Sequence, residues 1–525
     1  MKIKYFFIGE TPSFKQSKSL FKFLEAVGIP KDEVYFESIY DTKVKTYGVG
    51  DKDIKDELHV DYLFERTNKI REMVSQLHPR VIVIFGKTPL KVFYDFESVE
   101  SWRGSILEYK TEEKTYPLIP TFDPDEIHKG GGTSHWYLPA FMFDLKRAIQ
   151  VPSAFKESYR LIESPKELED YFVGKKEISF DIETVLRGGE RIKCIGFSSD
   201  GIEGVVVPFE ESSLYNTLDL QKIIKDRMES GEVKWIAQNG YGFDINYLER
   251  AWGIRMRGFH FDTMVAHHLL HPELPHDLGT LTSFYTLIPY YKHLSDVDLY
   301  RYNALDAIST FQIYKALTEE LKTRKLENFY FSYYHPLLTP LREMSRRGIK
   351  INQQTQKELK NALNEEIKKY QKEIDEEYKK HTRTDHLERR KRRIKMLIED
   401  GSRKTIFLRG KRVRLVSLLK RTETQIAKLE SINVRSSDAL GKFLYGNLGL
   451  PVQRKRGKPT TDETAINKLF ILTNHPFLKV ILKLREVENN MSKYGNMKLD
   501  DDGRVRTTYS FAETGRLRSG KFEAK

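Results

Sequence analysis

Cysteine is almost absent from this 525-residue chain, because Cys194 is the only one. A single cysteine excludes an internal disulfide, a cysteine-based zinc site and an iron–sulfur cluster, and it is typical of a reducing compartment. The sequence also lacks an apolar run of membrane-spanning length, and its first residues have no signal-peptide profile. We therefore predict a soluble cytoplasmic protein without membrane contact and without an iron–sulfur cluster.

Basic residues and apolar residues are both plentiful. The formal net charge is +13, which is typical of proteins with a nucleic-acid partner, although many basic proteins bind none. Hydrophobic residues make up 39% of the chain, enough for real cores. A chain of this length predicts about three domains. We place them at residues 1–152, 153–325 and 326–525, and we expect a multidomain protein of the α/β and α+β classes.

The first domain, residues 1–152, alternates strand and helix patterns. An apolar strand from Ile3 to Ile8 ends at Gly9, and the following helix stops near Gly28. Residues 81–85 are apolar without alternation, as in a strand that is buried on both faces. The pattern predicts a parallel sheet covered by helices. No phosphate-binding glycine motif follows either strand, so we expect no nucleotide cofactor.

A strand at residues 178–184 gathers carboxylates in the second domain. Side chains alternate along a strand, so Asp181 and Glu183 share the face opposite Ile178, Phe180 and Ile182. Two carboxylates aimed at one point suit a hard cation such as Mg²⁺ or Mn²⁺. The alternative for this stretch alone is an edge strand with a solvated acidic face.

Two further acids follow at positions that secondary structure can bring close. Asp244 lies where a short strand at residues 235–237 gives way to a helix, a place where the helix dipole alone favours an acid. Tyr302 and Asp306 are four residues apart in a predicted helix, and so lie one turn apart on the same face.

These pieces together resemble the three exonuclease motifs of the DnaQ-like superfamily, in its tyrosine-bearing branch. The motifs here are Asp181-x-Glu183, Asn239-x-x-x-Phe243-Asp244 and Tyr302-x-x-x-Asp306. The resemblance implies a DnaQ/RNase H-like fold and a 3′→5′ exonuclease with two Mg²⁺ or Mn²⁺ ions. It implies that Asp181, Glu183, Asp244 and Asp306 are the metal ligands, that Tyr302 aims the attacking water, and that Asn239 and Phe243 shape the site where DNA binds.

The chemistry is consistent with such a cluster. Four crowded carboxylates repel one another, and this raises their pKa values unless cations neutralise them. Two ions about 4 Å apart can bridge a scissile phosphate, activate water and stabilise the departing 3′-oxygen. His267, His268 and His271 follow in the sequence. We expect them to serve packing and surface roles, because the oxygen site is already complete.

The third domain begins with helices and a basic region. A helix is predicted to start at residues 334–336 with Pro in its first turn, and a long amphipathic helix occupies residues 359–378. The region from 389 to 421 is strongly basic. We interpret it as a phosphate-backbone contact rather than only a solvated face. Its candidate DNA-binding residues are Arg389, Arg390, Arg392, Arg393, Lys411 and Arg412.

The remaining sequence predicts helices followed by a hairpin-like element. Thr460 and Glu463 predict a capping box, and His475-Pro476 predicts another helix start. Asp502-Gly503 predicts a turn before a strand from Val505 to Phe511, and the sequence Thr514-Gly515-Arg516-Leu517 follows it.

In this order these pieces resemble the thumb and first palm strands of family A DNA polymerases, the bacterial DNA polymerase I type. The resemblance implies a mostly helical thumb with an incomplete palm, and it implies that Thr514 and Arg516 contact the primer–template. The basic insertion around residues 380–425 is unusual for the bacterial enzymes and suggests a phage-type member, which would place the protein in the host cytoplasm.

The expected function is that of the N-terminal part of a family A replicative polymerase. It would bind single-stranded 3′ ends and primer–template DNA and proofread by two-metal hydrolysis. In the family, the polymerase aspartates and the fingers helix follow the element at 514–517, so we expect a separate palm-and-fingers polypeptide as partner. The alternatives are a free-standing ribonuclease D-like 3′→5′ exonuclease and a non-catalytic DNA-binding polymerase subunit.

The first domain faintly resembles the uracil-DNA glycosylase fold. The matching pieces are residues 9–12, 81–86 and 120–124. Active members of that family place a histidine where Asp123 falls, and the iron–sulfur members use four cysteines. Since this chain has neither, we expect a non-catalytic module.

Overall fold

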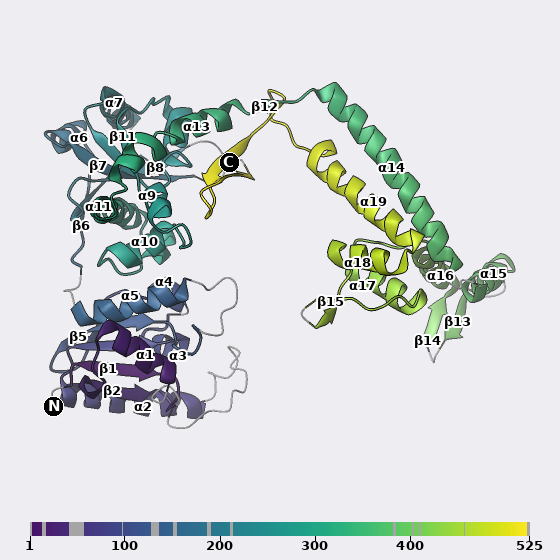
Figure 1. Ribbon diagram of the computed structural model, residues 1–525, viewed down its shortest axis with the longest axis horizontal. Coiled ribbons are helices and arrows are strands. Elements are labelled where there is room, and N and C mark those ends of the chain that lie inside the picture. Colours follow the sequence, from purple (N-terminus) through teal and green to yellow (C-terminus); the bar gives the residue numbers. More distant parts are fainter. Residues whose placement is uncertain are drawn as a thin grey trace. The chain divides into compact units, whose positions relative to one another are not determined.

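The computed structural model describes residues 3–12, 17–40, 57–96, 98–127, 136–150, 155–185, 191–209, 214–381, 385–401, 404–408, 411–455 and 457–521. The chain divides into two compact units (Figure 1). The first contains Met1–Arg346 and Thr507–Lys525, and the second contains Arg347–Arg506. The expected mixture of α/β and α+β parts is confirmed. Among the described residues, no helix combines the length and the apolar character that crossing a membrane requires.

A five-stranded sheet forms the N-terminal module. Its strands are β1 (Tyr5–Gly9), β2 (Val34–Ser38), β3 (Val81–Phe85), β4 (Leu107–Lys110) and β5 (Thr115–Thr121). Their order is β2-β1-β3-β5-β4, and every pair is parallel except β4 with β5. The accompanying helices are α1 (Lys18–Val27), η2 (Lys31–Glu33), α2 (Glu57–Leu77), α3 (Lys87–Tyr94), α4 (Val99–Trp102) and α5 (Tyr137–Gln150).

Helices cover both faces of this sheet. Phe7 and Val83 pack with residues of α1 and α5, whereas Phe6 and Ile82 pack with residues of α2 and α3. Adjacent residues of one strand therefore point into two different cores. This explains why β3 is apolar at every position rather than at alternate ones.

A six-stranded mixed sheet follows. Its strands are β6 (Ser158–Leu161), β7 (Glu177–Thr184), β8 (Ile192–Ser198), β9 (Glu203–Pro208), β10 (Lys234–Ala237) and β11 (Phe259–Asp262). The order is β11-β10-β7-β8-β9-β6, in which β7, β8 and β9 form an antiparallel meander. Strand β10 runs parallel to β7, and β11 runs parallel to β10. Strand β6 runs parallel to β9.

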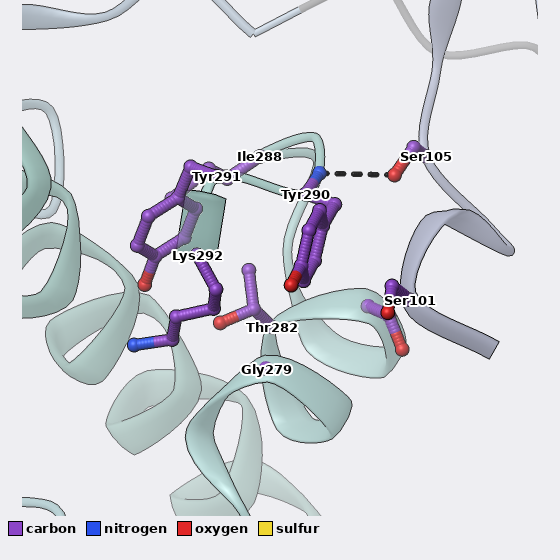
Figure 2. Close-up of a pocket in the computed structure, with 9 residues that line it drawn as sticks. Ser101, Ser105, Gly279, Thr282, Ile288, Tyr290, Tyr291 and Lys292 are labelled. Carbon is purple, nitrogen blue, oxygen red and sulfur yellow. Dashed lines mark hydrogen bonds between the residues drawn. The ribbon is translucent and has the colours of Figure 1, made fainter. Parts of the chain in front are cut away.

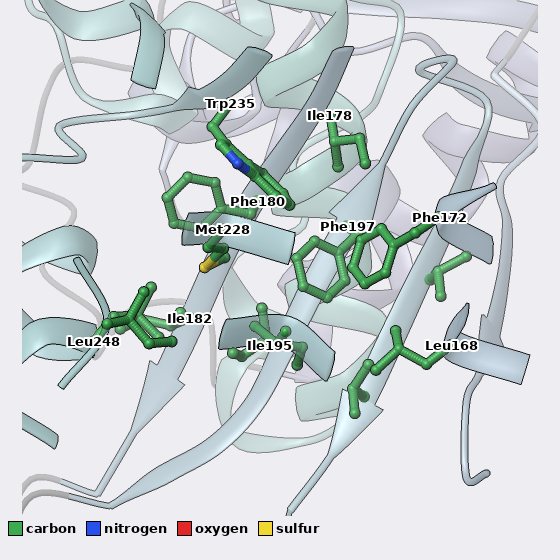
Figure 3. Packing of buried hydrophobic residues seen from close by; sticks show 14 of the residues in the cluster. Leu168, Phe172, Ile178, Phe180, Ile182, Ile195, Phe197, Met228, Trp235 and Leu248 are labelled. Atoms are coloured by element: carbon green, nitrogen blue, oxygen red, sulfur yellow. The ribbon is translucent and has the colours of Figure 1, made fainter. Parts of the chain in front are cut away.

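The helices of this part are α6 (Pro165–Phe172), α7 (Leu214–Ser230), α8 (Asp244–Trp252), α9 (Thr263–Leu270), α10 (Leu278–Tyr285), η4 (Lys292–Asp296) and α11 (Leu299–Thr323). Figure 3 shows the core on one face of the sheet, where Phe180, Phe197 and Trp235 pack against residues of α6 and α7. Helix α11 lies on β7, β8 and β9, and the hydroxyl of Ser179 in β7 donates to the Ala307 carbonyl of α11 at 2.6 Å. The two faces of β7 therefore serve different partners, as its alternation predicts.

Two later segments also belong to the first unit. They contain α12 (Glu327–Phe329), η5 (Tyr330–Tyr334), α13 (Leu338–Arg347), β18 (Thr507–Phe511) and β19 (Leu517–Lys521). Tyr334 stacks on Phe511 with ring centroids 4.3 Å apart, and both join a core that contains Phe261 of β11. The helix predicted at residues 334–336 begins instead at Leu338, after the π-helical turn of η5.

The second unit is mostly helical, as expected for a thumb. Its helices are α14 (Gln353–Lys380), α15 (Asp385–Glu399), α16 (Leu415–Glu430), α17 (Ser437–Gly441), η6 (Lys442–Asn447), α18 (Glu463–Thr473), α19 (Pro476–Asn490) and η7 (Met491–Gly495). Its strands are β12 (Ile349–Lys350), β13 (Thr405–Leu408), β14 (Lys411–Arg414), β15 (Arg454–Lys455), β16 (Lys458–Pro459) and β17 (Arg504–Val505). The long helix α14 packs along α19, with Ile374, Leu478 and Ile481 among the buried residues of one core.

Two local predictions in this region are wrong. The cap of α18 is Asp462, whose side chain accepts from the Ala465 N–H at 2.9 Å, so Thr460 and Glu463 form no capping box. The strand predicted from Val505 to Phe511 is two strands with different partners. The first, β17, pairs with β12, and the second, β18, pairs with β19.

Candidate active site

The strand β7 presents two carboxylates on the face that α11 covers. Ile178, Phe180 and Ile182 are buried in the core on the other face, so Asp181 and Glu183 point away from that core. The side-chain amide of Asn303, on α11, donates to Asp181 Oδ2 at 2.8 Å. Asn303 is a positioning residue that sequence reasoning missed, although it lies between Tyr302 and Asp306 of a recognised motif.

Glycines allow α11 to approach the sheet closely. A Cβ at Gly196 in β8 would lie 2.7 Å from the Asn303 carbonyl, and one at Gly204 in β9 would lie 2.7 Å from the Ala304 Cβ. Real Cβ atoms do not approach other atoms this closely, so larger residues at these positions would push the helix away. The acids of β7 and α11 therefore meet because small residues lie between the two elements.

Three of the four predicted acids come together. Asp181, Glu183 and Asp306 each offer a carboxylate oxygen, and these oxygens lie within 4.8 Å of one another. Burial raises the pKa of Asp181 well above its usual range, and the neighbouring Asp306, Asp244 and Glu183 add to the rise. Burial, followed by the charge of Asp306, raises the pKa of Glu183 to about 7. Without a bound cation, full ionisation of these carboxylates is therefore unfavourable.

The fourth acid, Asp244, lies beside this group of three rather than within it. It is the first residue of α8, and its Oδ1 accepts from the Ile182 N–H at 3.1 Å. Ile182 lies between Asp181 and Glu183, so this bond ties Asp244 to the strand that carries them. Burial raises the pKa of Asp244 to about 8.

A lysine and a tyrosine that no motif predicted also contact the cluster. Lys292 Nζ lies 2.5 Å from Asp306 Oδ1 and donates to the Tyr302 hydroxyl at 3.1 Å. The Tyr291 hydroxyl donates to the same Asp306 oxygen at 2.5 Å. Lys292 thus places a positive charge between the predicted water-aiming residue and a predicted metal ligand. The only sequence signal is the run Tyr290-Tyr291-Lys292 ten residues before Tyr302.

Asp262 orders the loop that leads to Asp244. Its carboxylate accepts from the N–H groups of Asn239 and Gly240, both at 3.0 Å, and it also caps α9. Asn239 has a φ of 57°, so this predicted site residue serves a tight turn. Phe243 follows that turn and remains 43% exposed beside the acids. An exposed aromatic ring at this position is available for contact with a nucleobase.

The histidines take packing positions. His267 and His268 are buried in α9, where His267 Nδ1 lies 2.8 Å from His276 Nδ1 and His268 Nδ1 lies 2.9 Å from the Tyr334 hydroxyl. His271 Nε2 lies 2.9 Å from a Glu320 oxygen. These contacts agree with the predicted structural role.

The predicted phosphate contacts lie on α15 and β14. Arg389, Arg390, Arg392 and Arg393 are all exposed on α15, whose opposite side packs on α16 through Ile394, Leu415 and Leu418. Arg409 and Gly410 fall outside the described residues, as do the side chains of Lys411 and Arg412. The exposed arginines suit either phosphate binding or a solvated face.

Residues 512–516 form the loop between β18 and β19, and Leu517 is the first residue of β19. The Ala512 N–H donates to the Arg516 carbonyl at 2.7 Å, and Gly515 has a φ of 74°. Thr514 and Arg516 are both exposed. The hairpin therefore presents its predicted DNA-contacting residues to solvent.

Asp123 follows the end of β5 in the N-terminal module. The strands β1, β3 and β5 are parallel, so their carboxyl ends share one edge of the sheet. A Cβ on Gly86, after β3, would lie 3.4 Å from the Asp123 Cβ. Burial raises the pKa of Asp123 to about 6, although the Asp125 N–H donates to it at 2.8 Å.

The acidic cluster fits a hard divalent cation. Its donors are carboxylate oxygens, which Mg²⁺ and Mn²⁺ prefer. Burial and the neighbouring acids raise the pKa values of Asp181 and Glu183, so a bound cation would stabilise their charged forms. Asp181, Glu183 and Asp306 could hold such an ion directly, and Asp244 lies one hydrogen bond away from the same strand.

Three segments of the chain match known protein families. Residues 2–146 match the uracil DNA glycosylase superfamily, residues 159–322 match the 3'-5' exonuclease family, and residues 407–522 match DNA polymerase family A. The resemblances drawn from the motifs are confirmed for these segments.

Several similar curated proteins are named DNA polymerase I. DNA polymerase I of Mycobacterium leprae (strain TN) is 36% identical over 95 residues, which are 17% of this chain and 10% of the relative. DNA polymerase I of Mycobacterium tuberculosis (strain ATCC 25618 / H37Rv) is 37% identical over 95 residues, with the same shares. These matches span about a tenth of the curated relatives' length. A solved structure, the POL domain of Pol1 from M. smegmatis in complex with DNA primer-template and dNTP, is 17% identical; the match covers 69% of this chain and 54% of that chain, with a TM-score of 0.48.

Proposed function

We propose that this chain, which joins a 3'-5' exonuclease domain to a family A DNA polymerase segment, removes nucleotides from 3′ ends of DNA and holds a primer–template duplex. The observation that carries the nuclease proposal is the cluster of Asp181, Glu183 and Asp306, with carboxylate oxygens within 4.8 Å of one another. Carboxylates gathered this closely in a partly buried place are costly unless cations bind them.

Two Mg²⁺ or Mn²⁺ ions would be held by Asp181, Glu183, Asp244 and Asp306. Such ions make water nucleophilic at neutral pH and stabilise negative charge on phosphate oxygens. The chain's own residues set the arrangement. Asn303 orients Asp181, and the Ile182 N–H orients Asp244.

Tyr302 and Lys292 would act on the attacking water and the phosphate. Burial and the charge of Asp306 raise the pKa of Tyr302, so its hydroxyl stays protonated and can donate a hydrogen bond. Lys292 donates to that hydroxyl at 3.1 Å and so fixes its direction. Its positive charge also offsets part of the negative charge of the acidic cluster when no metal is bound.

Substitution of Asp181 tests the nuclease. The purified protein should digest single-stranded DNA from the 3′ end with Mg²⁺ or Mn²⁺, and EDTA should stop it. Asp181→Ala should lower the rate by several orders of magnitude, because metal-borne stabilisation is worth several kcal/mol, roughly tenfold per 1.4 kcal/mol. Asp226→Ala, at an exposed acid of α7, is the matched control. Equal activity of the Asp181 variant and the control would refute the assignment.

Residues 326–525, the third predicted domain, would contribute duplex binding. The exposed arginines of α15 and the loop at Thr514 to Arg516 are the proposed contacts. Primer extension further requires palm carboxylates and a fingers helix, and a separate palm-and-fingers polypeptide is one possible source of them. The two-stranded sheet of β18 and β19 offers strand edges to which a palm could pair, whichever polypeptide supplies it.

A further inference from the structure

Two arginines are buried where the N-terminal module meets the exonuclease domain. Arg103 is 1% exposed and binds Asp144 of α5, which is fully buried. Asp144 also accepts from the Thr121 hydroxyl at 2.8 Å. A buried ion pair with this many partners is fixed in place, because losing one partner would leave a charge uncompensated.

Arg103 also reaches the exonuclease domain. Its Nη1 donates to the Ser283 hydroxyl of α10 at 2.7 Å, and its guanidinium lies 4.7 Å from the centre of the Phe284 ring. The next residue, Gly104, has a φ of 73°, and a Cβ there would lie 3.4 Å from the Ser283 carbonyl and 2.8 Å from Asp144. Glycine is therefore favoured at 104 by its left-handed backbone and by the nearby Asp144 carboxylate of the module, and the backbone at 104 lies in van der Waals contact range of α10.

Arg147 holds the backbone that follows α10. Its Nη2 donates to the Thr286 carbonyl at 2.9 Å, and its Nη1 donates to the Gly104 carbonyl at 2.5 Å. Residues 286–291 have no helix or strand of their own. Their order depends on such outside partners, because each free residue would otherwise gain about 1–2 kcal/mol of backbone entropy.

Ser105 contacts the backbone of Tyr290, the residue before Tyr291 of the active site. The Tyr290 N–H donates to the Ser105 hydroxyl at 3.0 Å, as the dashed line in Figure 2 shows. In the same view the side chains of Tyr291 and Lys292 point away from Ser105. Both of them bind Asp306 Oδ1 at 2.5 Å. A single short segment thus touches the module on one side and the acidic cluster on the other.

We propose that the N-terminal module is a positioning element of the exonuclease: Arg103, Ser105 and Arg147 hold residues 283–290 so that Tyr291 and Lys292 meet Asp306 and Tyr302. The inference rests on the proposed exonuclease function. A displacement of about 1 Å in a catalytic group costs on the order of 100-fold in rate, so a loosened segment weakens catalysis without touching DNA. The three module residues are therefore positioning residues and not catalytic ones.

A double-mutant cycle on the full-length protein tests this. Ser105→Ala combined with Arg147→Met should lower the single-turnover rate on single-stranded DNA by about tenfold with an unchanged Kd for DNA. Arg147→Lys, which keeps a donor, should recover part of the loss. In a Lys292→Met background the same pair should cost less than about twofold, because the module would then have lost the side chain that it positions. Arg80→Met, at an exposed arginine that contacts the Gln150 carbonyl, is the control and should match the wild type.

Hydrogen exchange separates this proposal from the nuclease assignment. Without metal or DNA, the peptide spanning residues 286–298 should exchange faster in the Ser105→Ala/Arg147→Met protein, and in Ser105→Ala alone, than in Arg80→Met. Unchanged exchange in this peptide would overturn the positioning role. It would also be overturned if the Ser105→Ala/Arg147→Met pair lowered the rate in the Lys292→Met background by the same factor as in the wild type. An inactive wild type with faster exchange in the variants would refute the proposed nuclease but support the contact.

Discussion

Burial shifts the pKa values of acids and of histidines in the first unit in opposite directions. Burial raises the pKa of Asp262 to about 6 and that of Asp244 to about 8, since desolvation disfavours the anion. Burial lowers the pKa of His335 to about 4 and that of His267 to about 3, since desolvation disfavours the cation. Low pH and high pH therefore oppose folding of this unit through different residues.

His335 gives the sharpest test at this scale. Its Nε2 has no hydrogen-bond partner among the described residues, and its ring packs between Phe259 and Tyr330. A histidine whose folded pKa lies below its unfolded value of 6.5 contributes stability above pH 6.5 and loses it as the pH falls toward 4. His335→Phe keeps a ring without the proton. Between pH 8 and 4.5 the wild type should lose about 2–3 kcal/mol of unfolding free energy relative to the variant.

Urea unfolding of both proteins, followed by circular dichroism at several pH values, measures that difference. A gap that stays constant from pH 8 to pH 4.5 would contradict the prediction, since the pKa of the ring would then be the same in the folded and unfolded states.

At the scale of elements, periodic patterns predicted much of the site. Alternation along β7 placed Asp181 and Glu183 on one face, and the four-residue spacing placed Tyr302 one turn from Asp306. The sequence did not predict the role of Lys292, because Lys292 follows an irregular segment. Such a segment has no helix or strand periodicity to indicate which way a side chain points. Its role depends on tertiary contacts with α11 and with the module.

Helix ends show the same limit at a finer level. The sequence Thr460-Thr461-Asp462-Glu463 offers overlapping caps, and local pattern alone does not choose among them. In the structure Asp462 caps α18 and also pairs with Lys455 at 2.9 Å. Asp462 is the cap because its carboxylate accepts from a backbone N–H and pairs with the charge of Lys455 at the same time.

The helix α15 carries the prediction for the basic insertion. Replacing Arg389, Arg390, Arg392 and Arg393 with Gln should weaken duplex binding equally for all sequences, because phosphate contacts carry no sequence information. The log–log dependence of affinity on salt should flatten by roughly one unit per lost contact. Fluorescence anisotropy at several salt concentrations measures the slope. The same slope in variant and wild type would mean that the arginines form only a solvated face.

At the scale of the whole molecule, one chain joins segments that match three families, and their activities need not all persist. The module matches the uracil DNA glycosylase superfamily. By the resemblance of residues 120–124 to that family, we expect Asp123 to fall where active members place a histidine. We expect no abasic sites after uracil-containing duplex is incubated with the nuclease-deficient Asp181→Ala protein. Alkali-labile cleavage at uracil would show that the module is catalytic. Its proposed positioning role does not depend on glycosylase chemistry.

The polymerase segment should act on duplex DNA through Arg516, at the loop of the β18–β19 hairpin. The bonds from Ala512 to the Arg516 carbonyl and from Gly515 to the Ala512 carbonyl hold the loop, while the Arg516 side chain is exposed. Arg516→Ala should raise the Kd for primer–template DNA about tenfold, roughly 1.4 kcal/mol, because it removes a charge-assisted contact. Digestion of single strands should stay near wild type, because the acidic cluster is untouched. Arg518→Ala removes the same charge from the same hairpin, where Arg518 instead donates to the Ser510 hydroxyl at 2.9 Å. An equal loss of primer–template affinity in the two variants would mean that only the net charge of the hairpin matters. A loss of affinity confined to Arg516→Ala would support binding of the primer–template at this loop.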